Sequence, residues 1–285
     1  DRFFSYKHYL DGNGELIAAW WKAALHNYAE DEHGNLLYSE GKERWASVPA
    51  LFYRKSADGG KTWGEAKSYQ SELLTLASPY GRIISAPDGT LLMPVYGIPR
   101  QPREGVHDIS ILLRSTDGGE TWGDESLVAT GHNETSFAFL PGGRLLAAAR
   151  SEVGGHVAIL HSDDLGRRWS DPVQVTRDGE HPADLTVLQS GRVLLTFGRR
   201  IRPMGCGLLL SSDNGQSWDT NHEVLLAGDG IESGDLGYPS TVQLEDGHLV
   251  TVLYYASGSE MSAGFRNAWG QVSCQAIHYR EEDIS

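Results

Sequence analysis

The chain has 285 residues, of which 40% are hydrophobic and 22% are charged, so it holds enough apolar sequence for one large folded domain. Its formal net charge of −14 argues against binding to nucleic acid or to an anionic membrane surface, because both ligands carry the same sign of charge. A small anionic ligand stays compatible with this charge, since a local arginine cluster acts at short range.

No apolar run approaches the roughly 18 residues of a membrane helix, so no membrane partner is expected. The sequence opens without a signal-peptide pattern, which leaves the compartment open, with a secreted or periplasmic protein favoured. Cys206 and Cys274 permit one disulfide, but free buried thiols are the simpler interpretation. Nothing in the sequence indicates an oligomeric state.

The first predicted strand begins near Phe3 and ends at residues 11–14, whose Asp-Gly-Asn-Gly sequence is a hairpin signal. The strand after this hairpin carries Trp21. Residues 23–45 are polar and irregular, and we predict no element there. An apolar run over residues 49–53 then reads as a buried strand that enters a turn.

That turn is the first of four copies of the pattern Ser-x-Asp-x-Gly-x-x-Trp. The copies occupy residues 56–63, 115–122, 162–169 and 211–218, and an apolar run precedes each of them. Ser and Asp side chains bind nearby backbone N–H groups, and Gly permits a positive φ angle. Each copy therefore predicts a tight hairpin, followed by a tryptophan that packs between adjacent sheets.

A second hairpin signal alternates with the first, at residues 87–89, 141–143, 189–191 and 245–247. Two hairpins in each period of about 40–50 residues give four strands, which is one blade of a β-propeller. We therefore predict an all-β fold, with one propeller domain over residues 1–285 built from four-stranded antiparallel blades. Five blades are readable, and they begin near Phe3, Tyr80, Glu134, Pro182 and Tyr238. Six blades are expected, the sixth being degenerate, completed by joining the two termini, or absent.

The four copies resemble the Asp boxes of the sialidase (neuraminidase) superfamily, also known for its BNR repeats, and the resemblance extends over most of the chain. In that superfamily the box is a structural turn on the face away from the active site. The box also occurs in lyases, other glycosidases and non-catalytic binding propellers. The resemblance therefore implies the fold, whereas the function has to be argued from the residues at the opposite face.

Counting from each hairpin glycine identifies equivalent positions at that opposite face. These positions hold Tyr80, Glu134, Pro182, Tyr238, Trp21, Tyr96, Arg150, Arg199 and Tyr254, with Arg82 and His181 one or two residues away. Charged groups are rarely buried without a partner. The set therefore predicts a polar pocket on the propeller axis, and the alternative is a solvated channel in which these residues fix the packing of the blades.

The resemblance implies a role for several of these residues. Residues 133–151 look like the sialidase segment that carries the catalytic glutamate and the second arginine, which implies these roles for Glu134 and Arg150. Residues 237–255 look like the segment with the tyrosine nucleophile, which implies this role for Tyr238. Sialidases use tyrosine, and the carboxylate of sialic acid would repel a carboxylate nucleophile. A phenol needs a neighbouring base, which Glu134 supplies.

Other residues are predicted to bind the substrate. The third arginine of the family falls at Arg199, Arg200 or Arg202, and the register stays open. Arg82, His181 and Tyr254 complete the predicted substrate-binding set. His181 is not typical of sialidases, so an acid–base role, a hydrogen bond to a sugar and a structural role all stay open.

The chain also departs from the family pattern. The Arg-Ile-Pro motif that carries the first arginine is missing from the sequence, and the general acid has no clear match beyond the loop residues Glu30, Asp31 and Glu32. No cysteine or histidine spacing is typical of a metal site, and the glycines do not form a phosphate-binding loop, so no cofactor is expected.

Three functions follow. The first is a sialidase-like glycoside hydrolase that acts on a terminal, acidic sugar. The second is a polysaccharide lyase or a non-sialic glycosidase that uses His181, Tyr238 and Arg199. The third is a non-catalytic carbohydrate- or protein-binding propeller, with aromatic side chains that stack on sugar faces. Those side chains are Trp20, Trp21, Tyr96, Tyr254 and Tyr255.

Overall fold

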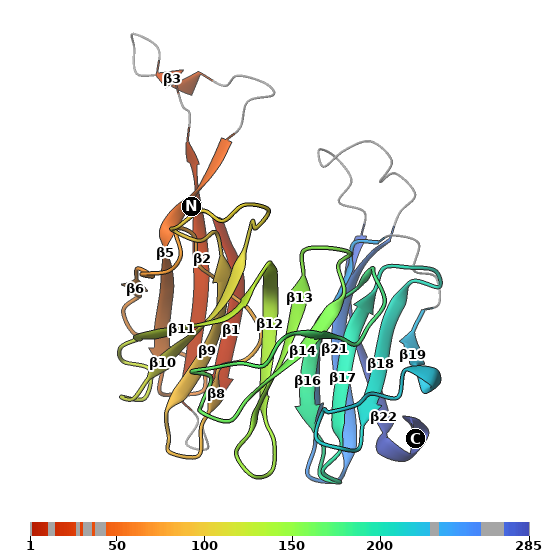
Figure 1. Cartoon of the computed structure of the whole chain (residues 1–285). Helices are drawn as coiled ribbons and strands as arrows, with labels where there is room; N and C mark the ends of the chain where they lie inside the picture. Colours follow the sequence, from red (N-terminus) through yellow and green to blue (C-terminus); the bar gives the residue numbers. More distant parts are fainter. Residues whose placement is uncertain are drawn as a thin grey trace.

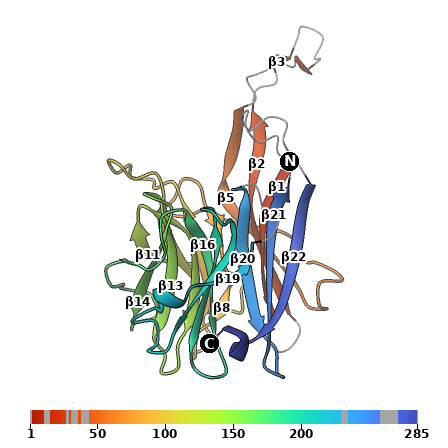
Figure 2. The same ribbon diagram turned by 90° about the vertical axis from the view of Figure 1, so that its right-hand side faces the viewer.

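The computed structural model describes residues 2–10, 15–26, 29–30, 36–37, 44–228, 234–257 and 271–284. Five antiparallel sheets follow one another along the chain and form the blades of a β-propeller (Figures 1 and 2). The predicted all-β propeller fold is therefore confirmed. Each predicted blade start lies within two residues of the beginning of a sheet, and a sixth blade is not found among the described residues.

The blades are numbered here in chain order. Blade 1 contains β1 (Arg2–Leu10), β2 (Leu16–His26), β5 (Arg44–Ser56) and β6 (Lys67–Tyr69). The strands β3 (Ala29–Glu30) and β4 (Leu36–Leu37) form a separate pair within the stretch for which the sequence predicted no element. Blade 2 contains β7 (Ser78–Pro79), β8 (Ile84–Ser85), β9 (Leu91–Gly97), β10 (Ile109–Ser115) and β11 (Gly123–Thr130), because its inner strand is split in two.

The later blades are more regular. Blade 3 contains β12 (His132–Phe139), β13 (Leu145–Ser151), β14 (Val157–Ser162) and β15 (Val173–Gln174). Blade 4 contains β16 (Glu180–Val187), β17 (Val193–Arg199), β18 (Gly205–Ser211) and β19 (Val224–Ala227), with the short helix η1 (Thr220–His222) before β19. Blade 5 shows β20 (Leu236–Gln243), β21 (His248–Ser257) and β22 (Gln271–Arg280), and η2 (Glu281–Ile284) follows.

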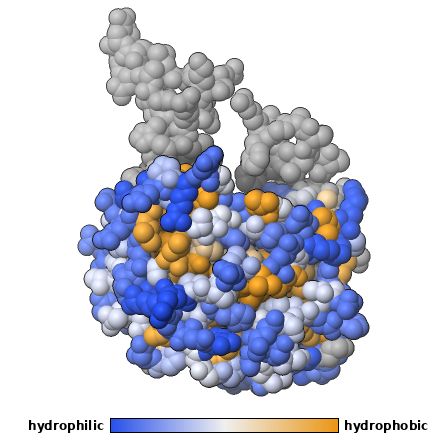
Figure 3. Space-filling view, in the orientation of Figure 1, coloured by the Kyte–Doolittle hydropathy of each residue, from blue (hydrophilic) through white to orange (hydrophobic). Residues whose placement is uncertain are grey.

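The core lies between successive blades. Four clusters of buried apolar side chains join blade 1 to 2, 2 to 3, 3 to 4 and 4 to 5. Every residue of β10 is buried, as expected for a strand covered on both faces. In blade 5, by contrast, Val242 is 50% exposed and Val252 38% exposed. The face seen in Figure 3 is mostly hydrophilic, with separate apolar patches.

The four Asp boxes form the predicted turns. In each box the Ser hydroxyl donates to the Asp carboxylate at 2.8–2.9 Å, and the Gly N–H donates to the Ser hydroxyl at 2.8–2.9 Å. Trp122 of the second box packs edge-on against Tyr53 of blade 1, with the ring centres 6.4 Å apart. The box tryptophan therefore contributes to packing between blades.

Two further expectations concern the cysteines and the membrane. Both thiols are free, and Cys206 is buried as expected. Cys274 is exposed, which corrects the expectation of two buried thiols, because its strand β22 lies at the outer edge of blade 5. Among the described residues, no helix has the length and apolar character needed to cross a bilayer.

Candidate active site

The inner strands of blades 3, 4 and 5 share an irregularity near their first residues. The pairing register shifts between Asn133 and Ser136 in β12, between Glu180 and Ala183 in β16, and between Gly237 and Ser240 in β20. A bulge of this kind inserts an extra residue, bends the strand and redirects a side chain. The redirected segments carry Glu134, His181 and Tyr238.

The backbone at two of these bulges is strained. Glu134 has a φ of 33° and Tyr238 a φ of 52°, both in the left-handed region that favours glycine. Such conformations cost about 1–3 kcal/mol and cluster at functional sites. The sequence places a glutamate and a tyrosine where glycine would be cheaper, so we infer that their side chains are needed there.

The two strained residues meet across the molecule. The Tyr238 hydroxyl donates a hydrogen bond to Oε1 of Glu134 at 2.5 Å, although the two residues are 104 positions apart in the sequence. Nη1 of Arg150 donates to the other carboxylate oxygen, Oε2, at 2.6 Å. Glu134 is only 6% exposed, whereas Tyr238 is 36% exposed. The phenol can therefore be reached from solvent while its carboxylate partner is covered.

Two tyrosines hold the ring of Tyr238. Tyr80 of blade 2 packs against it edge-on, with the ring centres 5.9 Å apart. Tyr254 lies at 5.7 Å with a tilt of 32°, and its hydroxyl donates to Oδ1 of Asp235 at 2.6 Å. Aromatic pairs at these distances are attractive, and they restrict the position of the Tyr238 hydroxyl.

The electrostatics match a phenol that needs a base. Burial and the Glu134 carboxylate raise the pKa of Tyr238 above its usual value of about 10, so the hydroxyl is protonated at neutral pH. Burial by itself would lower the pKa of the Arg150 guanidinium, but the Glu134 carboxylate outweighs this effect, so the pKa is raised. Glu134 therefore accepts hydrogen bonds from a neutral phenol and from a permanently charged arginine.

His181 lies beside this pair and is 6% exposed. Burial, together with the charges of Arg150 and Arg200, lowers the pKa of His181 to about 3, so the imidazole is neutral at physiological pH. Within the described part of the chain, its buried Nδ1 has no hydrogen-bond partner. The Nδ1 atom of this neutral imidazole can therefore form a hydrogen bond with a ligand.

Arg200 acts on two residues of this region through its charge. It lowers the pKa of His181, and it opposes the rise that burial and Asp235 cause in the pKa of Tyr254. Its buried Nε has no hydrogen-bond partner among the residues that the structure describes.

The other predicted arginines lie elsewhere. Arg199 donates from Nε to Oε1 of Glu223 at 3.0 Å, lies 3.3 Å from Glu180, and donates from Nη1 to the Ile201 carbonyl at 3.0 Å. These contacts brace blade 4. Arg202 is exposed, and no contact joins it to Glu134 or Tyr238. Arg82 contacts Asp184 of blade 4 and Thr241 of blade 5, not the Glu134 carboxylate.

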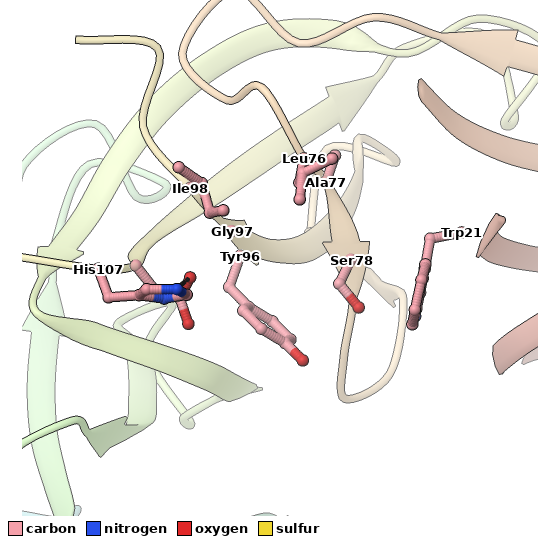
Figure 4. Close-up of a pocket in the computed structure, with 9 residues that line it drawn as sticks. Trp21, Leu76, Ala77, Ser78, Tyr96, Gly97, Ile98 and His107 are labelled. Carbon is pink, nitrogen blue, oxygen red and sulfur yellow. Dashed lines mark hydrogen bonds and ion pairs between the residues drawn. The ribbon is translucent and has the colours of Figure 1, made fainter. Parts of the chain in front are cut away.

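A pocket of about 200 Å³ adjoins the site (Figure 4). Its lining consists of Trp21, Leu76, Ala77, Ser78, Tyr96, Gly97, Ile98, His107 and Asp108. Burial and then Glu134 raise the pKa of Tyr96 to about 12, which places this tyrosine between the pocket and the catalytic candidates. Because the lining is largely apolar, the pocket suits a compact substituent of a ligand.

The sequence had singled out Trp21 and Tyr96 but missed His107 and Asp108, which lie in the segment between β9 and β10. Asp108 is 8% exposed and accepts a hydrogen bond from Nδ2 of Asn133 at 3.0 Å. His107, Asp108 and Glu152 bring donor atoms within 4.8 Å of one another. Both Glu152 oxygens already accept backbone N–H bonds, at 2.8 Å from Asp108 and 3.2 Å from His107, so hydrogen bonding accounts for the cluster.

The loop candidates Asp31 and Glu32, and the side chain of Glu30, lie outside the described part.

Known proteins resemble this chain in sequence and in fold. Residues 8–251 match the family model of a BNR repeat-like domain, which covers most of the chain. The chain belongs to this family. A sialidase from Bacteroides fragilis (strain YCH46) is 28% identical to it, over 76% of this chain and 43% of the relative. A sialidase from Clostridium perfringens is 27% identical over 40% of this chain and 32% of the relative. The chain thus spans less than half the length of either curated relative.

Solved structures support the fold of this BNR repeat-like domain. A protein of unknown function from Dyadobacter fermentans DSM 18053 aligns with a TM-score of 0.77 and 23% identity, over 97% of this chain and 76% of that one. Trypanosoma rangeli sialidase in complex with sialic acid aligns with a TM-score of 0.61 and 16% identity, over 98% of this chain and 44% of that one. The similarity at these identities concerns the propeller.

Proposed function

We propose that this domain is a retaining, sialidase-like glycoside hydrolase that acts on a terminal acidic sugar. The observation that carries the proposal is the 2.5 Å hydrogen bond from the Tyr238 hydroxyl to Glu134, made between two strained residues of different blades. The sequence similarity to two sialidases supports the same chemistry.

The proposed reaction uses the pair in sequence. Glu134 accepts the phenolic proton while the Tyr238 oxygen attacks the anomeric carbon and the bond to the leaving oxygen breaks. An acid delivers a proton to that leaving oxygen, and a covalent sugar–tyrosine intermediate remains. Water then attacks the anomeric carbon and gives a proton to the conjugate base of that acid, while Glu134 returns its proton to the departing Tyr238 oxygen, and the free sugar is released.

The proposed substrate carries a carboxylate. Arg150, whose Nη1 also donates to Glu134, supplies positive charge near Tyr238, and the charge of Arg200 acts on His181 and Tyr254. A guanidinium pairs well with a carboxylate. The neutral His181 can bind a sugar hydroxyl, and the pocket beside Tyr96 can take a compact apolar substituent. The lyase alternative required Arg199, whose donors are engaged by Glu223 and backbone carbonyls, so no observation favours it.

The deciding experiment is Tyr238→Phe, assayed on an aryl α-sialoside. We expect kcat to fall by at least about 10³-fold, because the nucleophile is lost, while the Kd for free sialic acid changes by less than about threefold. The matched control is Tyr69→Phe, since the Tyr69 hydroxyl also donates to a glutamate, Oε1 of Glu125 at 2.9 Å, but on the outer strand of blade 1. Unchanged turnover in Tyr238→Phe, or binding without turnover in the unaltered chain, would refute the proposal.

A further inference from the structure

Three blades meet at the backbone of one residue on the strand of Tyr238. Thr241 of β20 donates its N–H to Oδ2 of Asp184 in β16 at 2.7 Å. Its carbonyl accepts a hydrogen bond from Nη2 of Arg82, in blade 2, at 2.5 Å. The same Arg82 nitrogen also binds the Asp184 carboxylate, so the arginine, the aspartate and the backbone of Thr241 form a closed triangle.

The position of Thr241 makes this triangle important. It lies three residues after Tyr238, directly beyond the bulge that turns the tyrosine toward Glu134. β20 is the innermost strand of blade 5, so β21 pairs with only one of its edges. Buried backbone N–H and C=O groups require partners. At Thr241, Asp184 accepts from the N–H, and Arg82 and the Thr186 hydroxyl donate to the carbonyl, so two other blades supply these partners in place of a neighbouring strand.

The Thr241 side chain fixes the strand from the opposite side. Its hydroxyl lies 3.1 Å from that of Thr196 and 2.8 Å from that of Thr251, and Thr241 is only 1% exposed. The segment that supplies Arg82 also supplies Tyr80, which packs against the ring of Tyr238. Blade 2 therefore contacts the ring of Tyr238 through Tyr80 and the backbone of Thr241, on the same strand, through Arg82.

The burial of Asp184 and the strained backbone of Tyr238 both bear on the role of this triangle. The Asp184 carboxylate is 6% exposed, and a buried carboxylate is costly unless it is paired and hydrogen-bonded. A left-handed φ at a tyrosine persists only where the surroundings over-determine it. Fixing Thr241 leaves the bulge no freedom to relax toward a regular strand. We propose that Arg82 and Asp184 are positioning residues, which hold the strand of Tyr238 in the register that keeps its hydroxyl on Glu134.

This inference rests on the proposed function for its kinetic consequence, but not for its structural one. Arg82→Met removes the guanidinium, and we expect kcat to fall roughly 10- to 100-fold with KM within about a factor of two, because a displacement of about 1 Å is costly in catalysis. In its crystal structure the distance from the Tyr238 hydroxyl to Glu134 should exceed about 3.5 Å, beyond hydrogen-bonding reach. Arg82→Lys retains a positively charged donor, so it should restore a large part of kcat and of the contact between the Tyr238 hydroxyl and Glu134.

Arg192→Met is the matched control, because Arg192 pairs with Glu281 at 2.6 Å with similar partial burial but on the outer side of the fold. It should leave kcat and the distance unchanged. If Arg82→Met fails to fold, Asp184→Asn tests the same triangle with the same two measurements.

The outcomes separate the two proposals. A raised KM with unchanged kcat and an intact 2.5 Å contact would overturn the inference, and would show that Arg82 binds substrate directly. An intact contact with unchanged kinetics would also overturn it. If the unaltered chain shows no turnover, the proposed function fails, while a lengthened contact in Arg82→Met still supports the positioning role.

Discussion

The two ends of the propeller are built in opposite ways. At one end, four Asp boxes repeat the same hydrogen bonds between residues two and four positions apart. At the other end, the contacts join side chains of different blades, and the central contact joins positions 104 apart. The left-handed backbone positions differ in the residues they carry: every box places a glycine there, and two boxes also place Leu165 and Asn214, whereas the candidate site places Glu134 and Tyr238.

A box forms its turn with glycine and with hydrogen bonds inside one blade, and its tryptophan and glycine also pack against the neighbouring blade. The candidate site places side chains that carry chemistry at left-handed positions, and its central hydrogen bond joins two blades. Substitutions at the two ends should therefore affect different observables.

The largest effect is expected from Glu134→Gln. Glutamine retains an acceptor for the Tyr238 hydroxyl but is a poor base, so kcat should fall by about 10²- to 10⁴-fold. The control is Glu120→Gln in the second box, where the carboxylate pairs with Lys55 and Lys67 on the surface. Kinetics on an aryl α-sialoside provide the measurement. A similar loss of kcat in both variants would remove the functional distinction between the two ends.

The two ends should also differ in their response to acid. The pKa of His181 is lowered to about 3, so on unfolding it gains a proton at any pH between about 3 and its ordinary pKa of 6.5. The stability that this neutral, buried state contributes is complete above pH 6.5 and is lost as the pH falls toward 3. By contrast, hydrogen bonds from Thr121 and Ser115 lower the pKa of Asp117 to about 2, so the box keeps its contribution until the pH falls from about 4 toward 2.

The test is urea unfolding at pH 7.5, 6 and 5. In the unaltered chain the free energy of unfolding should decline as the pH falls below 6. In His181→Gln this decline should be smaller by up to about 1.4 kcal/mol per pH unit, which is the effect of one proton. His222→Gln serves as the control, because that side chain is 82% exposed. Parallel pH profiles for the unaltered chain and His181→Gln would contradict the prediction.

The last comparison concerns neighbouring glycines of one box. A Cβ at Gly119 would lie 2.3 Å from Cδ1 of the buried Ile17, whereas a Cβ at Gly118 meets nothing within 4 Å. Both have a positive φ, so Gly118→Ala should cost about 1 kcal/mol and Gly119→Ala about 2–4 kcal/mol of unfolding free energy. Both should leave kcat unchanged. Equal losses in urea unfolding would show that the contact with blade 1 is not tightly packed.

The sequence by itself determined the propeller and the position of its blades, because the boxes and hairpins are local signals set by Ser, Asp and Gly within a few residues. Repeat counting also selected Glu134, Arg150 and Tyr238, since equivalent positions in a repeat lie at equivalent places in the fold. Their contact, however, depends on bulges that no local pattern announced.

Only the tertiary structure shows which partners the arginines have. A shift of one residue along a strand turns a side chain to the opposite face, so the sequence could not choose between Arg199 and Arg200. Glu180 and Glu223 engage Arg199, and the charge of Arg200 acts on His181. Arg82 was predicted to bind the substrate, and in the structure it contacts Asp184 and Thr241, which are more than 100 positions away in the sequence. Local sequence fixes turns, whereas the partners of a charged side chain depend on which distant strands the fold brings beside it.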